Sequence, residues 1–135
     1  MASAIPDKMT AVIIERPGGP EVLKPVEMET PKPGHGQVLV KVAAAGVNRP
    51  DALQRTGNYP VPPGAPTWPG LEVAGTVVAV GPGVTRRREG ERVMALVQGG
   101  GYASYCNVDE ALAIPVPEAM TDIEAAGVPE TFFTV

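Results

Sequence analysis

The sequence contains very few of the residues that form disulfide bonds and metal centres. Its 135 residues include one cysteine, Cys106, and one histidine, His35. A single cysteine can form neither an internal disulfide nor a multi-cysteine metal site, which excludes a scaffold held together by disulfides. This cysteine usage favours the reducing cytoplasm as the location.

Strong charge of one sign and long apolar runs are also missing. The net charge is only −4, and the longest run of like charge is residues 86–88, three arginines. No basic surface for nucleic acid or for an anionic membrane is therefore expected. No stretch approaches the ~20 apolar residues that cross a bilayer, and the N-terminus lacks the apolar segment of a signal peptide. We expect a cytoplasmic protein without nucleic-acid or membrane partners.

Glycine and proline, by contrast, are abundant, with 16 of each. Together with a hydrophobic fraction of 44%, they favour a loop-rich all-β fold with a real core. Pro25 places its strand at a sheet edge, and Gly75 predicts a bulge or bend. The fold class predicted is mainly β, a partly open β-barrel with short helices. Short apolar or β-branched segments predict six to eight strands, among them 10–15, 22–29, 37–45, 71–80, 91–97, 102–108 and 111–115.

Two helix starts can be predicted. A short helix begins near Asn48, because Pro50 suits the first helical position and Asp51 the first turn. Thr121 and Glu124 form a capping box, so a second helix begins near residue 122. We therefore divide the chain into a β domain, 1–120, and a helical segment, 121–135. The apolar end TFFTV predicts a chain that stops within an element.

Several candidate chemical groups have simple structural interpretations. His35, in a glycine-flanked turn, is expected to be solvated, and Cys106 to pack as a small apolar group within a strand. The arginines at 86–88 are expected at a solvated hairpin tip, and the glycines at 99–101 as a flexible connection. No glycine-rich phosphate cradle stands between a predicted strand and helix, so the chain alone is not expected to hold a dinucleotide.

The stretch GVNRPDALQRTGNYP, residues 46–60, is different because its polar residues are varied and closely spaced. It contains Asn48, Asp51, two arginines and Tyr59. On composition alone, polar residues between a strand and a loop are typical of turn chemistry. From the residues alone, both a turn and an active site remain open.

Several motifs resemble, in order and spacing, the medium-chain dehydrogenase/reductase superfamily. They are AVIIERPGGPEVL, PGHGQVLVKVAAAGVNRPDALQRTGNYP, PGLEVAGTVVAVGPGV, GERVMAL, GGGYASY and AAGVPETFFT. Within the superfamily the chain resembles the zinc-free quinone oxidoreductases, the branch of zeta-crystallin and the p53-inducible quinone reductase, over about residues 9 to 135. The resemblance implies a GroES-like barrel followed by a Rossmann domain that binds NADPH. Residues 121–135 would then lead into a dinucleotide-binding domain absent from this chain, and the fragment alone is expected to be inactive.

The resemblance also implies that no metal is bound. Zinc-dependent alcohol dehydrogenases of the superfamily have a cysteine ligand at the position of Asn48 and a His-Glu pair at the position of Leu71-Glu72. Neither asparagine nor leucine offers the thiolate or imidazole that zinc prefers, and the four-cysteine structural zinc loop is missing. Glu72 is instead expected to cap backbone groups or to pair with Arg49 or Arg55.

The reaction implied is hydride transfer from NADPH to a small-molecule quinone or activated alkene. By resemblance, Asn48 would hydrogen-bond the nicotinamide ribose or the acceptor oxygen, and Tyr59 would close over the acceptor and donate a hydrogen bond or proton. Thr131 would lie near the nicotinamide. Asp51 is expected to fix the short helix and its arginine neighbours, and the full-length protein to be a homodimer.

Two other functions remain open from the sequence. One is a zinc-free enoyl-thioester reductase, whose site also pairs a tyrosine with a zinc-free barrel. The other is a stand-alone binding or assembly module that uses the GroES-like barrel for association. The physiological acceptor, and the choice between NADPH and NADH, cannot be read from these residues.

Overall fold

The computed structural model describes residues 4–134 and contains two antiparallel sheets. A two-stranded sheet pairs β1 (Lys8–Ile14) with β2 (Leu23–Glu29). A five-stranded sheet has the order β6-β3-β4-β5-β7. Its strands are β3 (Gln37–Ala45), β4 (Glu72–Val80), β5 (Arg92–Leu96), β6 (Tyr105–Asp109) and β7 (Ile114–Pro115). The helices are α1 (Arg49–Arg55), α2 (Asp122–Ala126) and α3 (Pro129–Thr134), with short 3-10 turns η1 (Pro20–Val22) and η2 (Glu110–Leu112).

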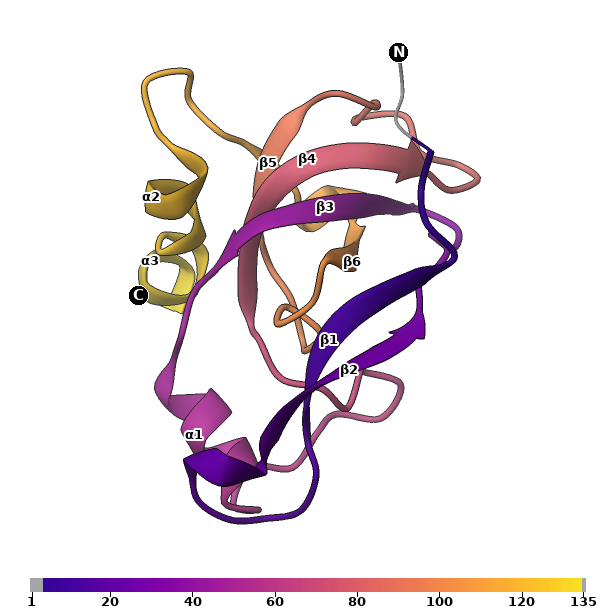
Figure 1. The fold of residues 1–135 in the computed structure, drawn as a ribbon. Coiled ribbons are helices and arrows are strands. Elements are labelled where there is room, and N and C mark those ends of the chain that lie inside the picture. The colour runs from indigo at the N-terminus through magenta and orange to yellow at the C-terminus, as the bar shows by residue number, and fades with distance from the viewer. Residues whose placement is uncertain (1–3, 135) are drawn as a thin grey trace.

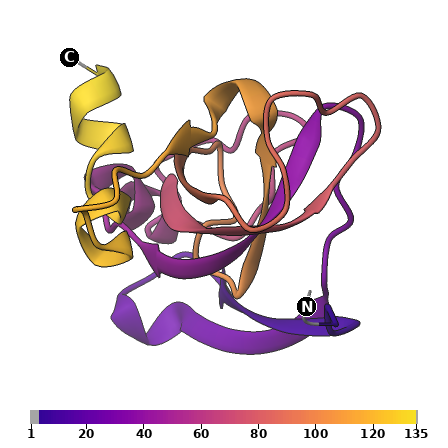
Figure 2. The same ribbon diagram turned by 90° about the horizontal axis from the view of Figure 1, so that it is seen from above.

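The two sheets are joined through the segment that precedes β6. The Val12 N–H donates to the Tyr102 carbonyl at 2.8 Å, and the Ser104 N–H donates to the Thr10 carbonyl at 2.9 Å. An isolated bridge between Ala11 and Ala103 lies between these bonds. Figures 1 and 2 show the β1–β2 pair lying beside the larger sheet. The sheets do not close completely, which agrees with the predicted mainly-β, partly open barrel.

The main core cluster is formed by side chains from the strands of the larger sheet and consists largely of valines. Alternate positions along β3 and β4 face inward, because successive side chains of a strand point to opposite faces. β-Branched side chains pack well on such a surface and have few rotamers to lose. The buried members of this cluster are Val38, Val40, Val73, Val77, Val93, Ala95, Cys106, Val108 and Ala113.

Proline and glycine occupy the positions that the sequence predicts for them. Pro25 lies in β2, opposite Val12 of β1. Because β2 has only one neighbouring strand in its sheet, the missing N–H of Pro25 removes no hydrogen bond from a central strand. The irregularity expected at Gly75 lies across from it, where the β3 register shifts between Val42 and Ala44. A Cβ atom on Gly75 would collide with the Lys41 carbonyl oxygen, so this glycine permits close approach of β3 and β4.

Helices α2 and α3 lie together at one side of the molecule, on the left in Figures 1 and 2. The predicted capping box is present: the Glu124 N–H donates to the Thr121 hydroxyl at 3.1 Å, and the Thr121 N–H donates to the Glu124 carboxylate at 3.0 Å. Helix α2 packs against β3, β4 and β5. Arg92 of β5 pairs with Asp122 at 2.9 Å, which fixes the start of α2 to the sheet. Within residues 4–134, no helix has the length and apolarity needed to cross a membrane.

Candidate functional site

Asn48 ends the connection from β3 and begins helix α1. Its backbone is extended, and its N–H donates to the Asp51 carboxylate at 2.9 Å. The Asp51 N–H donates back to the Asn48 carbonyl at 3.1 Å. Pro50 occupies the first turn, where its missing N–H and fixed φ are tolerated. The predicted helix start is therefore confirmed, and it places the Asn48 amide at the end of the barrel where β4 begins.

Glu72, the first residue of β4, is the central acceptor of the site. Its side chain is almost fully buried, and its Oε1 accepts a hydrogen bond from Asn48 Nδ2 at 3.0 Å. Its Oε2 accepts from the backbone N–H of Glu130 in α3 at 2.8 Å. The prediction that Glu72 caps backbone groups is confirmed. The other branch of that prediction, an ion pair with Arg49 or Arg55, is not formed within residues 4–134. Arg55 Nε donates instead to the Gly18 carbonyl at 3.1 Å.

Asp51 is a second buried carboxylate, only 6% exposed. Besides the Asn48 N–H, it accepts a hydrogen bond from the Tyr102 hydroxyl at 2.6 Å and a longer one from the Gly70 N–H at 3.3 Å. Its expected role in fixing α1 is confirmed, but its partners are a phenol and two backbone amides rather than the neighbouring arginines. Asp51 thus joins α1 to two loops that are distant in the sequence.

Tyr102 is the site residue that sequence reasoning missed. The sequence places it only within the strand pattern 102–108 and predicts a flexible connection for the preceding glycines at 99–101. The three glycines are instead buried. The Gly101 and Tyr102 N–H groups donate to the Gly70 and Pro69 carbonyls at 3.1 and 3.0 Å. A glycine triplet next to a tyrosine was the available signal for this close backbone approach.

The site concentrates negative charge without a neighbouring cation. Among the ion pairs formed within residues 4–134, none involves Asp51 or Glu72. Burial, and next the hydrogen bond to Asp51, raise the pKa of Tyr102 above its ordinary value, so the phenol stays protonated at neutral pH. Burial and the charges of Glu72 and Asp51 also raise the pKa of the Glu130 carboxyl. Tyr102 therefore acts as a hydrogen-bond donor here rather than as a ready acid.

The three residues predicted to contact reactants lie in different parts of the site region. Asn48 is within the hydrogen-bonded cluster, and exposed Thr131 follows Glu130, whose N–H belongs to that cluster. Tyr59 is half-buried in the loop between α1 and β4. Within residues 4–134 we find no hydrogen bond that links Tyr59 to Asn48 or Glu72. The structure thus brings Asn48 and the start of α3 together through Glu72, and Tyr59 remains on its loop.

The residues given simple structural interpretations mostly follow them. His35 is exposed, and Cys106 is 4% exposed within the valine core. Arg86 and Arg88 are exposed, as expected of a hairpin tip. Arg87 differs because it is half-buried and its Nε donates to the Ala113 carbonyl at 3.0 Å. Arg87 therefore fixes the hairpin to the chain before β7.

We expect Cys106 to be unreactive in the folded protein. Burial raises the pKa of its thiol to about 12, so almost no thiolate exists at mildly alkaline pH. Labelling with a chromogenic disulfide reagent should be slow in buffer and complete within seconds to minutes in concentrated urea. Rapid labelling of one thiol per chain in buffer would contradict the buried position.

The residues at the zinc positions of the superfamily's alcohol dehydrogenases do not fit a zinc ion. Asn48 presents an amide whose nitrogen already donates to Glu72, and Leu71 is a buried apolar side chain. Zinc sites in proteins require thiolate, imidazole or carboxylate ligands, and here only Glu72 qualifies. In the part of the chain that is described, no three His, Cys, Asp or Glu residues are grouped to hold a metal ion.

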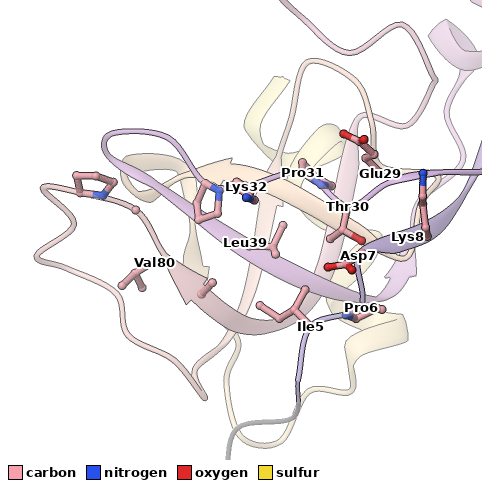
Figure 3. Close-up of a pocket in the computed structure, with 14 residues that line it drawn as sticks. Ile5, Pro6, Asp7, Lys8, Glu29, Thr30, Pro31, Lys32, Leu39 and Val80 are labelled. Atoms are coloured by element: carbon pink, nitrogen blue, oxygen red, sulfur yellow. The ribbon is translucent and has the colours of Figure 1, made fainter.

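A separate pocket of about 710 Å³ lies at the other end of the barrel (Figure 3). Leu39, near the start of β3, and Val80, at the end of β4, line this pocket. The candidate site lies at the opposite ends of the same two strands, because Asn48 follows the end of β3 and Glu72 begins β4. Ile5 of the N-terminal segment also lines it. None of the predicted site residues belongs to this pocket.

Residues 34–118 match the model of the alcohol dehydrogenase GroES-like domain. The chain is 44% identical over 104 residues to the synaptic vesicle membrane protein VAT-1 homolog of Rattus norvegicus, covering 77% of this chain and 26% of that protein. It is 38% identical over 128 residues to the quinone oxidoreductase of Sus scrofa, covering 93% of this chain and 39% of that protein. The chain thus spans well under half the length of these relatives.

Solved structures of quinone oxidoreductases and of an enoyl reductase are also similar to this chain. The quinone oxidoreductase from Coxiella burnetii matches with a TM-score of 0.86 at 29% identity, over 94% of this chain and 43% of that one. The mycobacterial protein Rv1454c, solved in complex with NADPH, matches with a TM-score of 0.78 at 40% identity, over 87% of this chain and 37% of that one. The CurK enoyl reductase matches with a TM-score of 0.85 at 27% identity, over 96% and 41% of the two chains.

Proposed function

This chain belongs to the alcohol dehydrogenase GroES-like domain family of the medium-chain dehydrogenase/reductase superfamily, and from that membership we propose that it is the acceptor-side domain of an NADPH-dependent quinone oxidoreductase. The observation that carries the proposal is the Asn48 amide, held by Glu72 at the start of α1. An amide held by a buried carboxylate orients a ligand through hydrogen bonds. It offers no ligand of the kind that a catalytic zinc ion requires.

The residues fit a nicotinamide cofactor as hydrogen-bonding partners. Asn48 Nδ2 is committed to Glu72, and the amide oxygen faces the Asp51 N–H in the capping box of α1. An amide oxygen has two lone pairs, so it can also accept a hydrogen bond from a ribose hydroxyl. Thr131 is exposed at the start of α3 and would lie beside the nicotinamide. When bound, NADPH supplies the hydride that reduces the acceptor. Similarity to a mycobacterial protein complexed with NADPH supports this choice of cofactor.

The chain's own contribution is to orient the acceptor and exclude water. Tyr59 lies half-buried in a proline-rich loop, and we assign to it closure over a quinone or activated alkene and a hydrogen bond to its oxygen. Holding donor and acceptor at reacting distance can by itself lower a barrier by roughly 7–11 kcal/mol. A zinc Lewis acid is not required for reduction of an acceptor as electrophilic as a quinone.

The proposal extends to the whole protein that carries this chain. Residues 1–120 form the acceptor-side domain and residues 121–135 lead toward a dinucleotide-binding domain, so the chain alone is inactive in this scheme. Its single cysteine supports a cytoplasmic location. The resemblance to quinone oxidoreductases supports a homodimer, which light scattering of the full-length protein would test.

The function is tested by following NADPH absorbance in the full-length protein with a benzoquinone as acceptor. We expect turnover with the quinone, and we expect Asn48→Ala to reduce kcat/KM by about tenfold or more, the value of one lost hydrogen bond in a dry site. Thr85→Ala, an exposed change remote from α1, is the control. No NADPH oxidation with any quinone would overturn the proposal.

A second candidate function is reduction of an enoyl thioester. Its supporting observation is the similarity to the CurK enoyl reductase over 96% of this chain. The same NADPH assay with an enoyl-CoA in place of the quinone separates the two functions. Turnover of the thioester without turnover of quinones would favour the second candidate.

A further inference from the structure

Glu72 connects two segments that are distant in the sequence. Asn48 lies 24 residues before it and Glu130 lies 58 residues after it, yet each donates to a different oxygen of the same carboxylate. Glu72 is only 2% exposed, so water has little access to its carboxylate. The neighbouring backbone leaves room for it, because a Cβ atom at Gly46 would collide with the Glu72 carboxylate.

Both partners of Glu72 are donors, and this makes a carboxylate the specific requirement. An ionised carboxylate offers two acceptor oxygens and no donor. Glutamine has the same shape but one oxygen and one NH₂ group, so it can accept from Asn48 or from the Glu130 N–H but not from both. The remaining contact would place two donors against each other in a buried site, which is unfavourable. Turning the Asn48 amide over would only move this conflict, because its NH₂ group would then face the Asp51 N–H, toward which its oxygen is directed in the capping box.

We propose that Glu72 is a positioning residue that couples the orientation of the Asn48 amide to the placement of helix α3. Through Oε1 it turns the Asn48 amide so that its oxygen faces away from Glu72. Through Oε2 it holds the first turn of α3, and with it Thr131. The inference rests on the proposed function for the roles of Asn48 and Thr131 toward a nicotinamide, whereas the coupling itself is a property of this chain.

The direction of the hydrogen bond between residues 48 and 72 can be reversed by substitution, and this tests the coupling. In Glu72→Gln the network loses one bond. In the double variant Asn48→Asp/Glu72→Gln, the new carboxylate accepts from the Gln NH₂ group while the Gln oxygen accepts from the Glu130 N–H. The network is then complete again, with donor and acceptor exchanged at one contact. Glu118→Gln, at an exposed carboxylate before α2, is the matched control.

The first measurement is amide hydrogen exchange by NMR on the 135-residue chain. We expect Glu72→Gln to speed exchange of the Glu130 amide by about tenfold relative to the Val40 amide, which lies in the central sheet and reports global opening. The double variant should restore the rate to within about threefold. If Glu130 and Val40 change in parallel, or if the double variant restores nothing, the coupling is overturned.

The second measurement is NADPH affinity of the full-length protein. We expect Glu72→Gln to weaken binding about tenfold and the double variant to recover part of that loss, while Glu118→Gln has no effect. Wild-type protein that binds NADPH but is unaffected by Glu72→Gln would overturn the positioning role and leave the proposed function intact. Wild-type protein that binds no nicotinamide nucleotide would overturn the proposed function, and the exchange measurement would still decide the coupling.

Discussion

Asp51→Ala should reduce the free energy of unfolding by about 3–5 kcal/mol, because it leaves three donors without their acceptor at roughly 1–3 kcal/mol each. The carboxylate accepts hydrogen bonds from the Asn48 N–H, the Gly70 N–H and the Tyr102 hydroxyl. Alanine leaves all three donors without this acceptor in a partly to fully buried site. Since small domains are stable by only roughly 5–15 kcal/mol, the variant should unfold at much lower urea concentration.

Two variants calibrate this expectation in equilibrium urea unfolding. Tyr102→Phe removes one of the three donors and keeps the ring, so it should cost about 1–2 kcal/mol. Asp109→Ala removes an exposed carboxylate that caps η2 through the Ala111 N–H, and should cost about 1 kcal/mol. A loss below about 1 kcal/mol for Asp51→Ala would contradict the three-donor arrangement.

The strands and helix starts could be predicted because their signals are local. The segment 37–45 was predicted with the bounds that β3 has, since its alternating apolar residues end in small ones. The Thr121–Glu124 capping box and Pro50 each specify a helix start within four residues of sequence. Such elements depend on near neighbours along the chain, so a single sequence contains the information that defines them.

The site could be predicted only in part, because its contacts are long-range. Resemblance indicated Asn48, but the Asp51–Tyr102 hydrogen bond joins residues 51 positions apart. It depends on buried glycines that bring one loop against another, which no periodicity reveals. The expected arginine pairing of Glu72 failed for a related reason: α1 directs Arg55 toward Gly18, a residue 37 positions earlier.

The site shows how the fold offsets the cost of burying two carboxylates without a cation. Asp51 accepts three hydrogen bonds and Glu72 accepts two, and all five donors are backbone N–H groups or neutral side chains. Hydrogen bonds to a charged acceptor are stronger than neutral ones, so they replace much of the lost hydration. The donors come from α1, the loop before β4, the glycine loop and α3, and the two carboxylates therefore join separate segments into one site.

Gly75→Ala should cost about 3 kcal/mol of unfolding free energy, at the upper end of the usual range for overpacking. An added Cβ would collide with the Lys41 carbonyl oxygen and lie 3.0 Å from Val40 Cγ1. The first of these atoms is backbone in the central β3–β4 pair, so it cannot move aside as a flexible side chain would. The strands must separate locally, and this disturbs the pairing from which Asn48 and Glu72 extend.

Gly127→Ala is the matched control for this prediction. Gly127 ends α2 with an ordinary φ of −92°, and a Cβ there would lie 3.6 Å from the Glu124 carbonyl oxygen, a normal contact distance. The same added methyl group should therefore change stability by no more than about 0.5 kcal/mol, as expected for a surface change without a steric conflict. Because Gly75, unlike Gly127, faces a backbone carbonyl at collision distance, equal effects in the two variants would show that β3 and β4 are not as closely paired as the register requires.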